Sequence, residues 1–312
     1  MAFEIPQAQL WLSVPALAVL GLCVGSFLNV VIHRLPLMME RQWWSDVAHQ
    51  LGDVESWKRL FGAQPAPVPL AQASGKLQQS IQGLPALSLA RPASRCPSCG
   101  HRIRWHENLP LLGWLRLGGK CASCGSRISA RYPLVELLTS LLFAAVAWRF
   151  GPQPVTLLWC GAVAVLVALA GIDWDTTVLP DGLTLPLLWA GLLSAALGWT
   201  GLPLTTALWG AAAGYLSLWS VYWLFKLTTG KEGMGYGDFK LMAALGAWLG
   251  WQMIVPVLLA ASVIGAIVGI GMKLNASLRE GRYVPFGPFL AGAGIAVMLA
   301  GEARVLRWLG WS

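Results

Sequence analysis

Long apolar runs restrict the folds open to this chain more than any other feature. Hydrophobic residues make up 56% of its 312 residues and charged residues only 12%, whereas a soluble domain usually carries about 25% charged residues. Such a chain lacks the polar side chains to cover a surface in water. Because a span needs about 20 apolar residues, we predict an all-α polytopic membrane protein with about eight transmembrane helices, at roughly 10–32, 134–150, 154–172, 183–200, 204–226, 239–251, 253–272 and 286–303.

Two of these runs have an alternative interpretation. The run 239–251 is short, so seven spans and a hairpin would also fit. The run 10–32 could be a signal peptide, but it follows acidic Glu4 and ends at Arg34 rather than at a small-residue cleavage site. We therefore expect it to be a retained first span.

A single long polar stretch separates the first two runs and suggests three parts. These are a first transmembrane helix (1–33), a cytoplasmic domain (34–133) and a transmembrane core (134–312). Within the domain, residues 37–90 are rich in Gln, Pro and Ala, which indicates a loosely structured linker with some helix around Glu40 to Leu51. Residues 91–132 contain four cysteines.

The placement of basic residues predicts the orientation. Thirteen of the 22 Lys and Arg residues lie between Arg34 and Arg131, which fits a cytoplasmic domain beside anionic lipid and argues against a nucleic-acid partner. With that stretch inside the cell, the N-terminus is periplasmic. The remaining cytoplasmic loops then carry Lys226, Lys231, Lys240, Lys273, Arg279 and Arg282, and the opposite face carries Arg149, Arg304 and Arg307.

Two aspartates stand at the cytoplasmic ends of apolar runs. Asp173 ends the run 154–172, and Asp238 of the GYGD segment precedes the run 239–251. Ionisable groups at membrane depth are costly and are therefore candidates for function. Two close carboxyl groups share one proton, as hydrolysis by an aspartyl mechanism requires. Asp175 is the rival of Asp173, and a solvated turn is the alternative for this loop.

Neighbouring residues suggest supporting roles. Gly235 and Gly237 would let an extended substrate backbone approach, and with Tyr236 they would position it. Lys240 could bias the charge of the aspartate pair, or its side chain could reach the interface. Two further contacts are expected, a helix cap by Asp181 and an ion pair of Arg131 with Glu136.

The cysteines form two CxxC pairs, with Cys96 and Cys99 in one and Cys121 and Cys124 in the other. This spacing predicts one structural zinc ion held by four thiolates, with no ligand position left for substrate. A pair of disulfides is disfavoured in the cytosol, and no thioredoxin-like pattern supports a redox role. His101 could replace one ligand.

The chain resembles the bacterial type IV prepilin peptidases, which are GxGD intramembrane aspartyl proteases. The similar segments occur in the family's order along most of the sequence. They are GSFLNVVIHRLP, CPSCGHRIRWHENLP with GGKCASC, ISARYPLVELLT, GIDWDTTVLPDGLTLPLL, GMGYGDFKLMAALGAWLG and VPFGPFLAGAG. By this resemblance the catalytic aspartates are Asp173, which precedes Pro180, and Asp238.

The resemblance also implies substrates and a cofactor. Such enzymes cut the basic leader from type IV prepilins and type II secretion pseudopilins at the cytoplasmic side of the bacterial inner membrane. Many then methylate the new N-terminal residue with S-adenosylmethionine. Gly119 and Lys120 resemble a family Gly-Lys pair beside the cysteines, and Glu107 is a further candidate for methyl transfer. The sequence predicts no oligomeric state.

Two other classes of protein remain to be distinguished. A transporter can carry intramembrane aspartates, but it usually has repeated halves with broken spans and needs no cysteine domain. A structural component of a secretion machine would need no pair of carboxyl groups.

Overall fold

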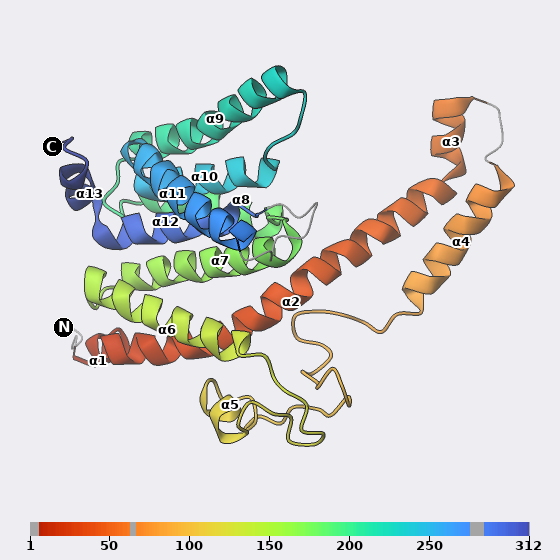
Figure 1. Ribbon diagram of the computed structural model, residues 1–312, viewed down its shortest axis with the longest axis horizontal. Coiled ribbons are helices and arrows are strands. Elements are labelled where there is room, and N and C mark those ends of the chain that lie inside the picture. Colours follow the sequence, from red (N-terminus) through yellow and green to blue (C-terminus); the bar gives the residue numbers. More distant parts are fainter. Residues whose placement is uncertain (1–5, 63–66, 275–283, 312) are drawn as a thin grey trace, which may run out of the picture.

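The computed structural model describes residues 6–62, 67–274 and 284–311 (Figure 1). These residues form helices and no extended strand, apart from two isolated β-bridges near the cysteines. The helices are α1 (Pro6–Trp11), α2 (Val14–Gly52), α3 (Val54–Phe61), α4 (Val68–Gln82), α5 (Leu112–Arg116), α6 (Arg131–Phe150), α7 (Pro154–Thr176), α8 (Asp181–Ala196), α9 (Leu204–Thr229), α10 (Tyr236–Leu249), a 3-10 turn (Trp251–Met253), α11 (Ile254–Leu274), α12 (Gly287–Ala300) and α13 (Glu302–Trp308).

Each of the apolar runs identified in the sequence is helical, which confirms the all-α fold. By length and composition, four helices among the described residues can cross a membrane, and a fifth if the bent pair α12 and α13 counts as one span. The helices α8, α10 and α12 have 16, 14 and 14 residues. At about 1.5 Å per residue they extend only about 21–24 Å, less than the roughly 30 Å of a hydrocarbon core.

Small residues allow the helices to pack closely. A Cβ atom at Gly25 of α2 would lie 2.7 Å from the Cα of Glu136 in α6, and one at Gly246 of α10 would lie 2.1 Å from the carbonyl oxygen of Gly210 in α9. Helix α10 lies at the centre of the second half of the bundle, where Phe239 and Leu241 are fully buried. It contacts α8, α9 and α12.

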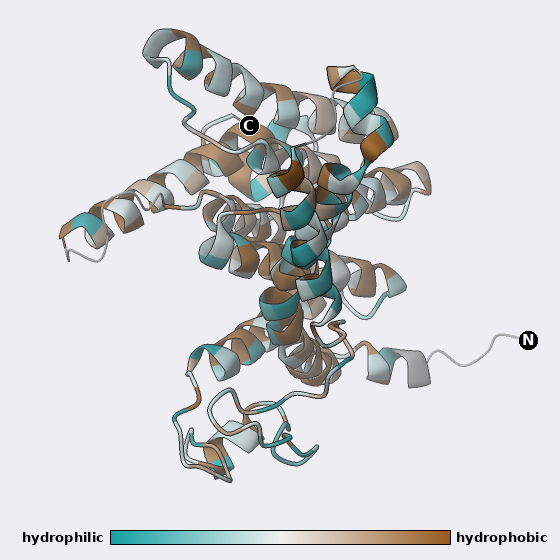
Figure 2. Cartoon of the chain, turned by 90° about the vertical axis from the view of Figure 1, so that its right-hand side faces the viewer, coloured by the Kyte–Doolittle hydropathy of each residue, from teal (hydrophilic) through white to brown (hydrophobic). Residues whose placement is uncertain are grey.

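Helix α2 extends well beyond the bundle and carries α3 and α4 at its far end (Figure 1). Asp53 accepts the N–H of Glu55 and caps α3, while Ser74 of α4 donates to the carbonyl of Ala48 in α2. The helix predicted around Glu40 to Leu51 is confirmed by α2, whereas the loosely structured linker predicted for the rest of 37–90 is wrong where α3 and α4 form. Figure 2 shows hydrophilic residues gathered in these projecting helices, nearest the viewer, and in the loops around α5.

The two ends of the bundle differ in their charges. We call the end where α7 terminates and α8, α10 and α12 begin the aspartate end, since Asp173 and Asp238 lie there. We call the opposite end, which carries Arg149, Arg304 and Arg307, the arginine end. The three arginines at the arginine end are the basic residues that the sequence placed on the face opposite the cytoplasmic loops. The orientation itself stays a prediction. Arg279 and Arg282, which also entered that argument, lie outside the described residues, as does Glu4, which was used to argue against a signal peptide.

Candidate active site and metal centre

Asp173 lies in the last turn of α7 and is 4% exposed. Its Oδ2 accepts a hydrogen bond of 3.0 Å from the backbone N–H of Gly287, the first residue of α12. A Cβ at residue 287 would lie 2.6 Å from the same oxygen, so only glycine allows this approach. Helix α7 ends at Thr177, whose left-handed φ of 56° turns the chain away just beyond the carboxyl group.

Asp238 lies in the first turn of α10 and is 8% exposed. Its carboxyl group is close enough to Asp173 for the two to interact electrostatically. Among the described residues its Oδ1 is buried and has no hydrogen-bond partner. A buried polar atom without a partner is costly, and such an atom beside a second carboxyl group is typical of a reactive site.

Leu179, in the loop between α7 and α8, connects the segments that carry the two aspartates. It is 8% exposed. A Cβ added to Gly237 would lie 2.8 Å from its Cβ, and one added to Gly287 would lie 3.2 Å from its Cδ2. Leu179 and Gly287 were assigned no role from the sequence. Their only signal was that they lie within the segments GIDWDTTVLPDGLTLPLL and VPFGPFLAGAG, because the contact itself depends on how distant helices pack.

Asp175 has a structural partner. Arg131, at the start of α6, donates to its Oδ1 at 2.7 Å and to the carbonyl of Gly171 at 3.3 Å. The expected pair of Arg131 with Glu136 is therefore wrong. Glu136 is 8% exposed and instead accepts the N–H of Leu111 at 2.8 Å. The contact of Arg131 joins the start of α6 to the end of α7, which bears Asp173. The contact of Glu136 joins α6 to the loop at Leu111, close to the cysteines.

Lys240 of α10 pairs with Asp181 of α8, with its Nζ at 2.6 and 2.7 Å from the two carboxylate oxygens. Asp181 is the first residue of α8 and makes no capping hydrogen bond, so the predicted cap is wrong. The lysine charge is neutralised by this pair, which favours a role in joining α8 to α10 over a direct action on the aspartates.

The glycines before Asp238 differ in their surroundings. Gly235 has an ordinary φ of −83°, and a Cβ there would meet nothing closer than Oδ2 of Asp238 at 3.9 Å. Gly237 is needed for contact with Leu179. Tyr236 is half exposed and its ring contacts Tyr222. Gly235 and Tyr236 thus remain open to an approaching chain.

The four cysteines converge at one point, as the spacing predicts. Their Sγ atoms all lie within 4.8 Å of one another, with 3.8 Å between Cys96 and Cys124 and 3.9 Å between Cys99 and Cys121. Sulfurs at about 2.3 Å from a tetrahedral zinc are about 3.8 Å apart, so the thiols fit one ion. All four are free of disulfides.

Each CxxC pair sits in a turn closed by backbone hydrogen bonds. The N–H of Cys96 donates to the carbonyl of His101, and that of Cys121 to the carbonyl of Ser126. The Ser126 hydroxyl, together with the backbone N–H groups of Cys99 and Ser98, lowers the pKa of the Cys96 thiol to about 5, which favours the thiolate. This cluster can hold a metal ion.

The candidates for methyl transfer lie beside this cluster and do not form one site with the aspartates. Gly119 has a left-handed φ of 69°, and a Cβ there would lie 2.9 Å from the indole of Trp114. Lys120 is exposed. Glu107 accepts the N–H of Arg104 at 2.8 Å, which with nearby His101 lowers the pKa of its carboxyl. These contacts give Glu107 a part in holding the fold around the cysteines.

Comparisons with known proteins agree with this geometry. Residues 19–150 match the bacterial peptidase A24 N-terminal domain, and residues 160–270 match the type IV leader peptidase family. A protein of Aeromonas salmonicida named prepilin leader peptidase/N-methyltransferase is 48% identical over 99% of this chain and 97% of its own length. Proteins of the same name from Stutzerimonas stutzeri and Pseudomonas aeruginosa are each 49% identical over 93% of this chain and over 92% and 91% of their own lengths. No solved structure matches.

Proposed function

The chain belongs to the type IV leader peptidase family, and on this premise we propose that it cleaves the basic leader from type IV prepilins and type II secretion pseudopilins. We further propose that it methylates the new N-terminal residue with S-adenosylmethionine. The observation that carries the proposal is the pair of buried carboxyl groups, Asp173 and Asp238, brought together from two distant helices.

The hydrogen bonds suggest how the two aspartates divide the work. The N–H of Gly287 stabilises negative charge on Asp173, so this carboxylate takes a proton from the attacking water. Asp238 retains the shared proton and donates it to the oxygen of the scissile carbonyl. The Oδ1 of Asp238, which is buried and has no hydrogen-bond partner among the described residues, is left free to carry the shared proton.

Access for the substrate is best at Gly235 and Tyr236. A Cβ at residue 235 would meet nothing closer than 3.9 Å, which leaves room for an extended peptide backbone. Tyr236 offers an exposed ring beside it. The contact of Leu179 with Gly237 and Gly287 lies behind the substrate. It sets the spacing of the segments that carry Asp173 and Asp238.

We propose that one zinc ion is bound by Cys96, Cys99, Cys121 and Cys124. Four thiolates favour zinc over harder cations. With four protein ligands the ion stabilises the fold and does not contact substrate. Methyl transfer is proposed for the same domain, with Lys120 beside Gly119 available to a carboxylate of the methyl donor because its side chain is exposed.

The aspartate end is proposed to face the cytoplasm of a bacterial cell, in the inner membrane. The support is the basic character of the 34–133 domain. The transporter and the structural component are disfavoured, because membership in this family implies a peptidase and the carboxyl groups of Asp173 and Asp238 interact electrostatically.

The test is cleavage of a purified prepilin in detergent by Asp173→Asn, Asp238→Asn and Asp175→Asn, with zinc content and monodispersity measured for each. We expect the first two to lose cleavage and to retain zinc. Asp175→Asn is the matched control, because it is two residues from Asp173 but pairs with Arg131, and it should cleave within severalfold of the wild type. Normal cleavage by either of the first two variants would overturn the proposal.

A further inference from the structure

A cavity of about 260 Å³ lies at the arginine end, at the other end of the bundle from the aspartates. It is lined by Arg149 at the end of α6, by Gly301 at the break between α12 and α13, and by Arg304 and Arg307 on α13. Helix α13 is bent by 103° from α12, so it lies across the bundle and brings its two arginines toward α6.

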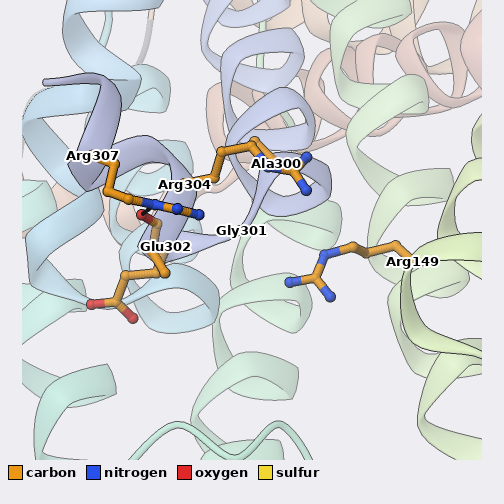
Figure 3. A pocket seen from close by; sticks show the side chains of 7 residues that line it. Arg149, Ala300, Gly301, Glu302, Arg304 and Arg307 are labelled. Atoms are coloured by element: carbon orange, nitrogen blue, oxygen red, sulfur yellow. Dashed lines mark hydrogen bonds between the residues drawn. The ribbon is translucent and has the colours of Figure 1, made fainter.

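The guanidinium groups at this cavity have no anionic partner within the part of the chain that the structure describes. None of the three arginines forms an ion pair with any residue that the structure describes. Figure 3 shows Arg149 and Arg304 pointing into the same space, while the carboxylate of Glu302 points away from Arg149. A Cβ at Gly301 would lie 2.6 Å from Nη2 of Arg149, so the glycine leaves room for that group. Paired guanidinium forks match a phosphate in shape and charge.

A second cavity of about 200 Å³, with a more apolar wall, adjoins the charged one and shares Gly301 and Glu302 with it. Its wall includes the rings of Phe150, Trp159 and Trp248. It also includes Thr200, whose Oγ1 is buried and has no hydrogen-bond partner among the described residues. The two cavities therefore offer a compartment with three arginines and one acidic residue beside a more apolar one, which suits an amphipathic anion.

Exposed tryptophans indicate where these cavities lie relative to the bilayer. Trp148 lies in the last turn of α6, Trp199 just after α8, Trp251 in the 3-10 turn after α10 and Trp308 at the end of α13, and they are 85%, 59%, 53% and 74% exposed. Tryptophans concentrate where hydrocarbon meets the headgroups of a bilayer. The anions present at that depth are those of phospholipids.

We infer that this site binds the phosphate headgroup of an anionic phospholipid. Arg149 and Arg304 are the main donors to the phosphate oxygens, and Arg307 adds positive charge from the same helix as Arg304. The apolar cavity takes the adjoining glycerol and the start of an acyl chain, with Thr200 donating to an ester oxygen. The site is independent of the aspartate pair and of the proposed cleavage.

The experiment measures lipid binding to the purified full chain in a non-ionic detergent by native mass spectrometry. The probes are phosphatidylglycerol, phosphatidylcholine and inorganic phosphate. We expect phosphatidylglycerol to bind more tightly than the other two. Arg149→Gln with Arg304→Gln should weaken it by about tenfold per arginine, the scale of one charge-assisted hydrogen bond.

The control variant Arg59→Gln with Lys76→Gln removes the same charge from exposed positions of α3 and α4 and should bind phosphatidylglycerol like the wild type. Helix content and monodispersity establish that each variant is folded, and Arg304→Gln alone provides a milder change. Equal binding of phosphatidylcholine, or an undiminished affinity in the double variant, would overturn the inference. Phosphate binding as tight as that of the lipid would overturn the assignment to a phospholipid.

Discussion

The contact between Gly287 and Asp173 gives the sharpest test of the proposed active site. In Gly287→Ala the new methyl group would lie 2.6 Å from Oδ2 of Asp173 and 3.1 Å from its Cγ. Contacts under 3 Å are not tolerated, so the carboxyl group must move and its hydrogen bond to the N–H of residue 287 must lengthen or break. The backbone at 287 is outside the left-handed region, so alanine adds no dihedral strain there.

The expected loss follows from the hydrogen bond. A hydrogen bond to a charged group contributes about 1.5–3 kcal/mol, and each 1.4 kcal/mol corresponds to about tenfold in rate. If the bond stabilises Asp173 as the base, Gly287→Ala should lower kcat for prepilin cleavage by roughly tenfold to a hundredfold. Because the residue lies behind the substrate, KM should change much less.

The same helix offers a matched control. Gly292 of α12 would meet no heavy atom within 4 Å if it carried a Cβ, so Gly292→Ala should cleave like the wild type. Steady-state cleavage of a fluorescent prepilin peptide, with melting temperatures for both variants, measures the effect. Wild-type kcat in Gly287→Ala, or an equal loss in Gly292→Ala, would refute the reasoning from this contact.

Three further outcomes are expected. Cys99→Ser should lose most of the bound zinc, measured by elemental analysis, and should destabilise the cysteine region toward proteolysis; full zinc retention would contradict four-thiolate binding. Lys240→Gln should leave the rate of cleavage within about threefold of the wild type, since an exposed ion pair contributes roughly 1 kcal/mol or less. A loss as large as that of Asp238→Asn would instead indicate that Lys240 acts on the charge of the aspartate pair. The lowered pKa of Glu107 means that its stabilising effect is present above the unfolded pKa of about 4.3 and is lost as pH falls through the folded value. Denaturant unfolding should therefore separate the wild type from Glu107→Gln at pH 7 and bring the two together in acid.

Local spacing explains what the sequence could predict. The CxxC pairs encode their own turns, so the convergence of four thiols follows from residues close in the chain. Asp173 and Asp238 stood out because charges beside apolar runs are rare. The helices α3 and α4 were missed because the segment 37–90 is rich in Gln, Pro and Ala, which suggested a loosely structured linker. Pro69 falls in the first turn of α4, where a helix tolerates proline, and Asp53 caps α3.

Long-range contacts lay beyond the sequence. The N–H donor to Asp173 is 114 residues away along the chain, and the partner of Arg131 is 44 residues away. Charge alone suggested the nearer Glu136 for Arg131. The helix ends decide otherwise, because α6 begins beside the point where α7 terminates. Only the packing of these ends shows that, among the described residues, Asp175 forms an ion pair with Arg131 and Asp173 forms none.

The short helices bear on how water reaches the aspartates. Helices α10 and α12 begin at the aspartate end and finish beside Trp251 and α13 at the arginine end. If those ends lie at one interface, helices of about 21 Å place the pair roughly 9 Å short of the other surface of a 30 Å core. Water then enters by a recess, and an apolar segment of substrate can stay in the bilayer. A nitroxide on Tyr236→Cys should thus collide with oxygen more often, relative to a water-soluble nickel chelate, than one on Lys231→Cys. Equal collision ratios would place the pair at the surface.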